Sequence, residues 1–350
     1  MESLPAEAEE RWPTDIVERR ETAMLARFAE AEPELAPLRS GVAEATRAGC
    51  VPVLAQWIVI LGGGWLTWNL WGEPVLGWVS LGLTIVLALA MGGWSAAADA
   101  ATATEQEALD TYLRDHVLYA REAFLPEEGL APFQEMGVFG RYDEADLRSF
   151  EAEGYPLMHV HLTRSETTRD SKGEEQTRTT TVFSGLCFEL PFPVRGELAE
   201  GQGSVTIVER GLSAAPQGRF VRYGPGGQVR PKRIKTASLD FNRRHTVFTT
   251  DPVMGHAVLD PDRTMRLTQM EHDLADTQLW GRQAYAMAIA EGRMWMVMPD
   301  VDRPQTQGFE VGEGLADALK KSFYPLSVPS VVAHHLKLPL PAYMVEAEAS

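Results

Sequence analysis

The sequence predicts a membrane protein, in which a two-helix transmembrane hairpin precedes a cytoplasmic α+β domain with an antiparallel sheet. Two observations lead to this prediction. Residues 48–98 hold two long apolar segments, and Glu73 is their only acidic or basic side chain. Beyond Tyr155, apolar and polar residues alternate with the period of two that is typical of strands. Strand-like and helix-like stretches then follow one another without regular βαβ order, which favours α+β.

The apolar segments 51–72 and 74–98 are each long enough to cross a bilayer. A hydrocarbon core of about 30 Å needs roughly 20 apolar residues in a helix. Backbone amides in lipid must bond within their own helix, so we expect two helices joined by a tight Gly-Glu-Pro turn at residues 72–74. Tryptophans, which prefer membrane interfaces, mark the segment ends at Trp65, Trp68, Trp71, Trp78 and Trp94.

Charge placement predicts the orientation of this hairpin. Arg39 and Arg47 precede the first segment, Arg114 and Arg121 follow the second, and the turn has no basic residue. The positive-inside rule then places both termini in the cytoplasm, with the hairpin in the inner membrane. Neither segment contains a charge inside the bilayer, so the sequence disfavours a transporter or a channel.

The segments beside the hairpin read as helices. Residues 1–47 form an N-terminal amphipathic helical segment that Pro33 and Pro37 are expected to interrupt. Residues 99–125 form a juxtamembrane helix that ends before Pro126. Because both emerge on the same side of the bilayer, they could pack together as a stalk.

Residues 126–335 are expected to form the cytoplasmic domain, and residues 336–350 a Pro-rich tail. We expect a β-hairpin from the strands at 158–162 and 179–188, with its turn at 170–173. Further expected strands cover 204–208, 246–249 and 294–298. Expected helices cover 144–151, 263–275, 279–290 and 315–323.

Composition excludes several classes of function. A formal net charge of -17 and a pI near 5.0 argue against a nucleic-acid partner, whose phosphates require a basic face. Cys50 and Cys187 are too few for a disulfide framework. Cys50 abuts the first span and could be palmitoylated, but we interpret it as a plain small residue. We expect no cofactor.

Parts of the soluble region are similar to a known family. The stretch TTTVFSGLCFELPFPVRG contains Phe183, Gly185, Leu186, Phe192 and Gly196, and a later stretch contains residues 245–248, Asp251, Ala257 and 259–261. In these features, residues 100–300 and the preceding hairpin resemble bacterial two-span membrane proteins known only as a domain of unknown function. The chain departs from the family pattern with Phe248 in place of tyrosine, Cys187 in place of phenylalanine, and an apparent insertion at 219–235. The resemblance implies an architecture and no chemistry.

No catalytic or metal-binding motif emerges. His159 and His161 share one strand face but lack a third metal ligand, so we interpret them as a solvent-facing pair. His334 and His335 should diverge, and Cys187 is expected to be a packed core thiol. The stretch at Ser184 lacks a nucleophile elbow, and the glycines after Tyr223 lack the Lys-Ser/Thr of a phosphate-binding loop. Polar neighbours that could act as acid or base, but that we interpret as loop residues, are His245, His256, His272, Asp240, Asp251 and Asp273.

One basic stretch stands out in this acidic chain. No acidic residue occurs within it, so we expect no acid to oppose its cations, which are Arg219, Arg222, Arg230, Lys232, Arg233 and Lys235. Near an anionic leaflet each could contribute about 1 kcal/mol. We interpret the stretch either as a contact for anionic lipid headgroups or an acidic partner, or as a solvated loop that balances the domain's own acids.

The sequence therefore predicts an integral membrane protein that acts as a binding or scaffolding module of unknown ligand, with an unknown protein partner. A membrane-tethered enzyme of unidentified chemistry is the alternative class, although no motif supports it. A third interpretation is an accessory subunit that docks through its glycine-bearing spans.

Overall fold

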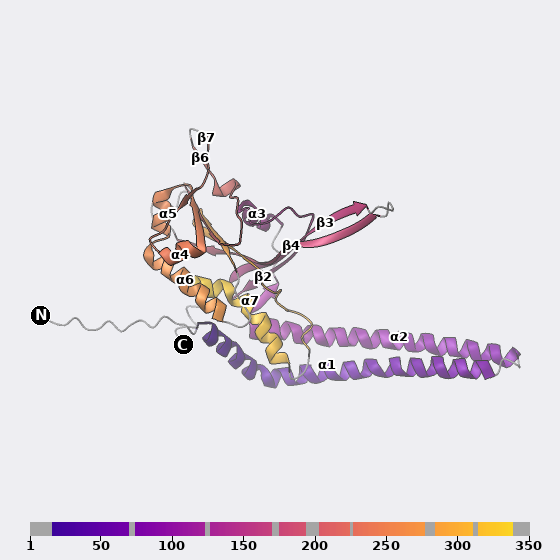
Figure 1. Ribbon diagram of the computed structural model, residues 1–350. Helices are drawn as coiled ribbons and strands as arrows, with labels where there is room; N and C mark the ends of the chain where they lie inside the picture. The colour runs from indigo at the N-terminus through magenta and orange to yellow at the C-terminus, as the bar shows by residue number, and fades with distance from the viewer. Residues whose placement is uncertain are drawn as a thin grey trace. The chain divides into compact units, whose positions relative to one another are not determined.

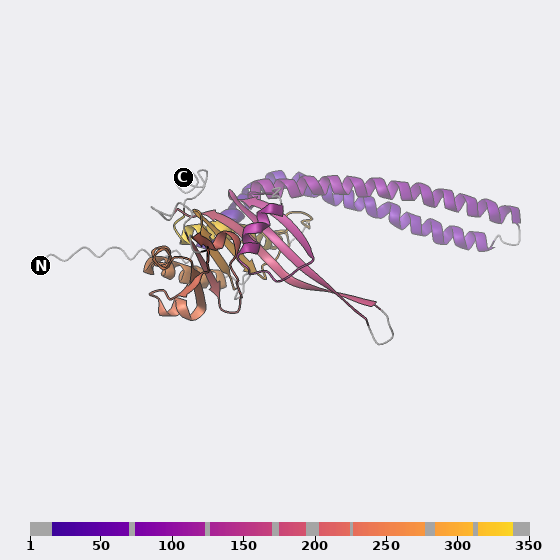
Figure 2. The same cartoon turned by 90° about the horizontal axis from the view of Figure 1, so that it is seen from above.

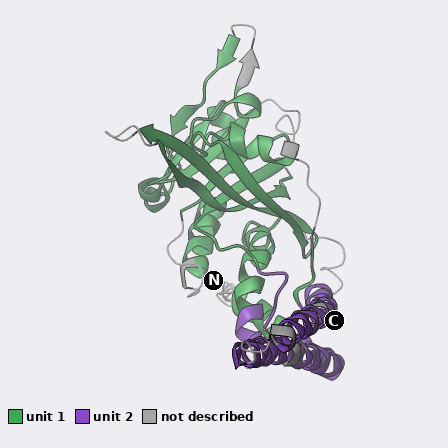
Figure 3. Ribbon diagram, turned by 90° about the vertical axis from the view of Figure 1, so that its right-hand side faces the viewer, with its two compact units in different colours: residues 1–24, 118–304, 320–350 green, residues 25–117, 305–319 purple. Residues whose placement is uncertain are grey.

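The computed structural model describes residues 16–69, 74–122, 127–169, 175–193, 203–224, 227–276, 284–310 and 314–338. The chain divides into two compact units (Figure 3). One unit comprises Met1–Met24, Leu118–Pro304 and Lys320–Ser350 and holds a large sheet. The other comprises Leu25–Val117 and Gln305–Leu319 and holds most of a long helical hairpin.

The helical hairpin consists of α1 (Ile16–Asn69) and α2 (Pro74–Tyr112), after which a π-helical turn covers Leu113–Leu118 (Figure 1). The most apolar stretch of α1 has no buried part, and that of α2 is 7% buried. Of the 21 exposed large apolar side chains among the described residues, 17 lie between Val53 and Leu89. By length and composition, the two helices could therefore each span a membrane, as the sequence predicts.

Small and polar residues join the two helices. Thr67 Oγ1 and Ser80 Oγ are hydrogen-bonded at 3.1 Å and are buried. The backbone at Gly63 lies against Thr84, whose side chain would overlap any Cβ at residue 63. Gly82 has open space beside it. Gly63 therefore belongs to the helix–helix contact, and Gly82 faces away from it.

Outside the apolar segments the two helices remain paired. The Tyr112 hydroxyl donates a hydrogen bond to Glu34 Oε2 at 2.6 Å. α1 continues through Pro33 and Pro37, so the predicted interruption is wrong. A proline removes one backbone hydrogen bond and crowds the preceding turn. Here the neighbouring Leu35 is fully buried, and this packing, with the Glu34 bond, outweighs the local cost.

The other unit is organised around a nine-stranded sheet in which every neighbouring pair is antiparallel, which confirms the predicted antiparallel sheet. In spatial order its strands are β1 (Ala120–Glu122), β2 (Glu144–Ala152), β3 (Tyr155–Arg169), β4 (Glu175–Pro191), β11 (Arg293–Pro299), β10 (Ala286–Ala290), β5 (Ser204–Glu209), β9 (His245–Thr249) and β8 (Lys232–Ile234). A separate two-stranded sheet pairs β6 (Arg222–Gly224) with β7 (Gly227–Val229).

Helices cover this sheet. They are α3 (Ala131–Glu135), α4 (Leu239–Arg244), α5 (Pro252–Val258), α6 (Pro261–Asp276) and α7 (Leu315–His335). Every residue of β10 is buried, which requires cover on both faces of the sheet. One core cluster contains Phe133 and Met136 from α3 and its end, Met158 from β3, Cys187 from β4 and Trp295 from β11. The central strands are therefore enclosed by packed side chains.

The predicted β3–β4 hairpin is confirmed, and it is longer than expected. The two strands extend together beyond the rest of the sheet as a polar ribbon (Figure 2). Hydroxyl pairs cross it at 3.2 Å, between Ser165 and Thr179 and between Thr167 and Thr177. The predicted turn at 170–173 lies outside the described residues.

Tight glycine-containing turns fix two other hairpins. Glu153 and Gly154, between β2 and β3, have φ values of 49° and 74°. Glu291 and Gly292, between β10 and β11, have φ values of 54° and 72°. Two consecutive positive φ angles are what a two-residue hairpin turn requires. Gly185 of β4 meets another constraint, because the backbone at Met298 leaves no space for a Cβ there.

Several element predictions are wrong. Residues 144–151 form strand β2 instead of a helix, because nine residues pair with β3 and outweigh local helix propensity. The juxtamembrane helix ends early and residues 120–122 form β1. Residues 286–290 form β10 within the segment predicted as helix 279–290. α7 continues through Pro325 and Pro329 to His335, within a segment that is almost entirely buried.

Candidate functional site

The candidate site lies at the edge of the sheet, where α4 packs beside β8. α4 begins at a capped residue, because Ser238 Oγ accepts the Phe241 N–H at 3.2 Å. Asn242 ties α4 back toward β8. Its amide nitrogen donates to the carbonyl oxygens of Thr236 at 2.7 Å and Ser238 at 2.6 Å, and its Oδ1 accepts the Thr236 N–H at 2.9 Å. These bonds hold α4 next to the end of the strand.

A cavity of about 510 Å³ opens here, and we name it the β8–α4 cavity. The described residues that line it are Arg210, Arg233, Ile234, Lys235, Leu239, Asn242 and Arg243. Four of these are cationic, and Leu239 is apolar although it is 76% exposed. None of them carries a carboxylate, an imidazole or a thiol. The described cavity wall therefore supplies positive charge and an apolar surface.

The charge at this wall is largely uncompensated. Within the described part of the chain, Arg210, Arg233 and Lys235 are exposed and form no ion pair. Arg243 reaches Asp240 at 3.4 Å, but both side chains are 78% exposed. Such an exposed pair contributes about 1 kcal/mol at most. The cavity is thus a local concentration of positive charge in a chain whose net charge is -17.

The structure separates the basic residues that the sequence groups together. Arg233 and Lys235 line the β8–α4 cavity. Arg230 and Lys232 are exposed and are not among its lining residues. The two pairs therefore offer the same charge in different surroundings.

Arg219 has a different role. Its Nε donates to Glu135 Oε2 at 2.6 Å, and its guanidinium lies 5.6 Å from the ring centroid of Trp295. The expectation that no acid opposes the basic stretch is therefore wrong for Arg219, since Glu135 lies far from it in the sequence. Arg222 belongs to β6, and its side chain lies outside what the structure describes.

A buried polar network fastens α4 and β9 to α6. At its centre, Glu271 Oε1 lies 2.7 Å from His245 Nε2 and accepts the Tyr285 hydroxyl at 2.9 Å. The other oxygen, Oε2, lies 2.8 Å from an Arg244 guanidinium nitrogen. The His245 ring stacks on Phe241 with centroids 4.3 Å apart. The network fixes the helix that forms one wall of the cavity.

Two further groups in this region have shifted pKa values. Burial, and then the neighbouring Glu271 carboxylate, raise the pKa of Glu209. Burial raises the pKa of Tyr285 well above its usual range, and Glu271 adds to the effect. The His245 and Tyr285 side chains are almost completely buried, so neither can reach a solute in the cavity. We therefore interpret the network as structural.

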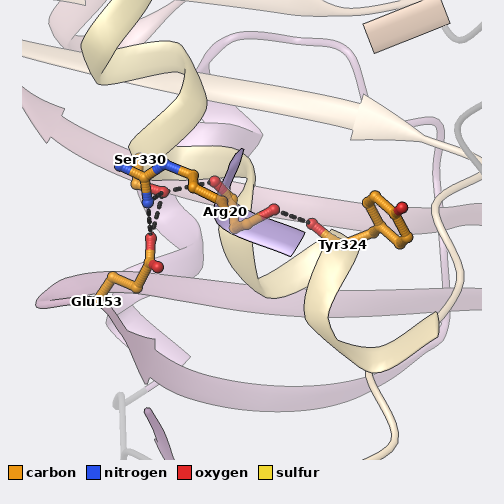
Figure 4. Close-up of polar contacts among 5 residues, drawn as sticks. Arg20, Glu153, Tyr324 and Ser330 are labelled. Atoms are coloured by element: carbon orange, nitrogen blue, oxygen red, sulfur yellow. Dashed lines mark hydrogen bonds and ion pairs between the residues drawn. The ribbon is translucent and has the colours of Figure 1, made fainter. Parts of the chain in front are cut away.

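A second polar cluster fastens the start of α1 to the sheet unit (Figure 4). Arg20 forms an ion pair with Glu153 and donates a hydrogen bond to Ser330 Oγ at 2.7 Å. Ser330 also bonds to Glu153, and the adjacent Glu21 accepts the Tyr324 hydroxyl. The Arg20 and Glu153 side chains are only 13% and 11% exposed. α1, β2–β3 and α7 thus meet at one buried set of charges.

The prediction that His159 and His161 both face solvent is wrong for His159. His159 is buried, its Nε2 lies 3.2 Å from the Val301 carbonyl oxygen, and burial lowers its pKa. His161 is half-buried. The rings of His334 and His335 lie 6.5 Å apart and nearly perpendicular; His335 is buried beside Asp273, whereas His334 is half-buried. Among the described residues, no group of three His, Cys, Asp or Glu side chains could hold a metal ion.

Other predicted polar neighbours do not pair as their sequence order suggests. His245 contacts Glu271, Asp273 lies 3.1 Å from His335, and Asp251 caps α5 by accepting a backbone N–H at 2.8 Å. Each of these contacts has a structural purpose. The rest of that set, Asp240, His256 and His272, is exposed.

The two cysteines differ as expected. Cys187 is fully buried, and burial raises the pKa of its thiol well above the usual range. This confirms a core thiol. Cys50 is exposed on α1.

Sequence reasoning missed Arg210, Leu239 and Arg243 because they lie outside the contiguous basic stretch. The backbone N–H of Arg210 donates to the Arg244 carbonyl oxygen at 2.7 Å, which holds Arg210 beside the end of α4. Only the strand register reveals this juxtaposition. The interpretation of the site rests on its geometry, since no family model, curated protein or solved structure matches this chain.

Proposed function

We propose that this chain is a two-span protein of the bacterial inner membrane with both termini in the cytoplasm. Its hairpin tethers the sheet unit, which acts as a cytoplasmic binding or scaffolding module for an anionic ligand. The apolar helices support the anchor, and the arginines at 39, 47, 114 and 121 support the orientation. The observation that carries the binding role is the set of four cations at the β8–α4 cavity, of which Arg210, Arg233 and Lys235 form no ion pair among the described residues.

Binding explains this surface better than catalysis does. The described lining residues contain no carboxylate, imidazole, hydroxyl or thiol that could act as a nucleophile or as a general base, and their one amine, that of Lys235, belongs to an exposed residue. An enzyme would need such a group beside its substrate. A cationic wall without one matches recognition of an anion.

Anionic lipid headgroups fit this region better than an acidic protein does. Leu239 of α4 is 76% exposed and Val253 of α5 is 78% exposed, and α5 contacts both β8 and β9. Exposed apolar side chains close to cations are typical of surfaces that touch a bilayer. Each cation near an anionic leaflet contributes about 1 kcal/mol.

Lipid binding to the full chain tests this proposal. The protein is purified in mild detergent, and native mass spectrometry counts bound phosphatidylglycerol against phosphatidylcholine. One variant carries Arg210→Gln, Arg233→Gln and Lys235→Gln at the β8–α4 cavity. The control carries Arg164→Gln, Arg169→Gln and Arg178→Gln in the β3–β4 ribbon, which removes the same charge.

Three lost contacts of about 1 kcal/mol each sum to about 3 kcal/mol and predict a loss of phosphatidylglycerol binding of about a hundredfold in the first variant. The ribbon variant should keep most of its binding. Equal losses in both variants would contradict a specific surface, because they would show a response to net charge alone.

A further inference from the structure

The β8–α4 cavity has chemical features that go beyond a general attraction to anions. Its four cations come from three places in the chain: Arg210 after β5, Arg233 and Lys235 at β8, and Arg243 in α4. Like charges at one site repel each other, and an acidic chain has many carboxylates that could have neutralised them. None of the described carboxylates lines this wall.

The polar groups available to a ligand here are all donors. Asn242 is the one uncharged polar residue of the described lining, and its amide is already occupied by Thr236 and Ser238. The remaining groups are three guanidiniums and one ammonium. A ligand that satisfies them must offer several acceptor oxygens and more than one negative charge, as a phosphate group does.

The cavity is also larger than a phosphate needs. A volume of about 510 Å³ lies within the range of small-molecule sites, which is roughly 300–1,000 Å³. Ile234 and Leu239 supply an apolar wall beside the cations. A phosphate group attached to an apolar body would therefore match both the cations and this wall.

We infer that the β8–α4 cavity is a binding site for a phosphate group attached to an apolar body. The inference deepens the proposed function and rests on it for the anionic nature of the ligand. The shared chemistry has two sources, which are a soluble organic phosphate and the headgroup of an anionic lipid. Arg233 and Lys235 bind the phosphate oxygens, and Leu239 contacts the apolar part.

Phenyl phosphate is the soluble probe, since it joins a phosphate to an apolar ring. The full chain is placed in nanodiscs of neutral phosphatidylcholine, and calorimetry measures binding of phenyl phosphate, inorganic phosphate and phenol. A second arm uses native mass spectrometry to count phosphatidylglycerol retained from nanodiscs that contain it. Both arms compare Arg233→Gln/Lys235→Gln with the matched control Arg230→Gln/Lys232→Gln, which makes the same charge change outside the cavity.

We expect phenyl phosphate to bind more tightly than inorganic phosphate, and phenol not to bind. The cavity pair should weaken phenyl phosphate binding at least about tenfold, and the control pair less than about threefold. Leu239→Ser should reduce the preference for phenyl phosphate over inorganic phosphate. If the soluble probes do not bind and phosphatidylglycerol retention falls with the cavity pair alone, the phosphate comes from a lipid.

The inference is overturned if the cavity pair and the control pair have equal effects in both arms. It is also overturned if the cavity pair changes neither phenyl phosphate binding nor phosphatidylglycerol retention. Failure of the proposed function looks different. The proposed function fails if the wild-type chain shows no preference for phosphatidylglycerol or if the hairpin does not cross the membrane. Binding of phenyl phosphate still tests the role of the cavity in either case. Unchanged thermal unfolding of the exposed-residue variants shows that they fold.

Discussion

Replacing Arg20 by methionine tests how strongly the start of α1 is fastened to the sheet unit. The substitution keeps an apolar stem and removes the guanidinium. Removing one partner of a buried ion pair costs about 3–5 kcal/mol, because the other charge stays buried without its counterion. Arg20 and Glu153 keep 13% and 11% of their side-chain exposure, and Ser330 still bonds to Glu153. We therefore expect a loss of about 2–3 kcal/mol in the free energy of unfolding.

A double-mutant cycle isolates the pair itself. Arg20→Met, Glu153→Gln and the double variant form one cycle. The control cycle uses Arg169→Met and Glu175→Gln, whose side chains are 73% and 57% exposed in the ribbon. An exposed pair of this kind contributes about 0–1 kcal/mol. The two cycles share their chemistry and differ in burial.

Pulse proteolysis of the full chain in mild detergent, over a urea series, measures cleavage of the sheet unit. Arg20→Met should move the midpoint to lower urea, and the double variant should recover part of that loss. The coupling energy should exceed about 1 kcal/mol for the buried pair and stay below that value for the ribbon pair. Equal coupling energies in the two cycles would refute the reasoning.

Three further predictions concern other positions in the chain. Glu209→Gln should stabilise the protein at pH 8 and have little effect at pH 4. The pKa of Glu209 is raised in the folded state, so its contribution to stability is fully present below its ordinary pKa and is lost as pH rises. A urea series at both pH values measures the change in unfolding free energy, and equal changes at the two pH values would argue against this prediction. Gly185→Ala should lower the urea midpoint by an amount equivalent to about 2 kcal/mol or more, because the backbone blocks a Cβ there, and an unchanged midpoint would contradict that close approach. Gly63→Leu should separate the two helices of the hairpin, because Thr84 leaves no space for a side chain at residue 63. In a chain that carries Thr67→Cys and Ser80→Cys, this separation should abolish the disulfide cross-link between the two positions, whereas Gly82→Leu should keep it.

Strong, local patterns were predictable from the sequence. The apolar segments are long and free of charge, so the helical hairpin follows from length alone. The β3–β4 hairpin follows from alternation over its buried half. In both cases the residues of the segment are sufficient to predict its secondary structure, because the spacing of the apolar residues matches the repeat of the helix or strand.

Elements that depend on distant partners were not predictable. β10 is buried on both faces, so its sequence AMAIA has no alternation and reads equally well as helix. β2 carries helix-forming residues, and its pairing with β3 decides its conformation. The same applies to the site. Arg233 and Lys235 stood out in a basic run, while Arg210 and Arg243 join them only through the strand register and the fold of α4.

We propose that the hairpin has both flanks in the cytoplasm, and cysteine labelling in intact cells can determine this orientation. The measurement uses the full chain with Cys50→Ser and Cys187→Ser, and with one new cysteine at either Gly72 or Thr167. A membrane-impermeant maleimide should label the cysteine at Gly72 once the outer membrane is opened, and the exposed one at Thr167 only after the inner membrane is disrupted. Labelling at Thr167 before that step would contradict the proposed orientation. Release of the chain from membranes by carbonate would contradict the membrane-spanning hairpin.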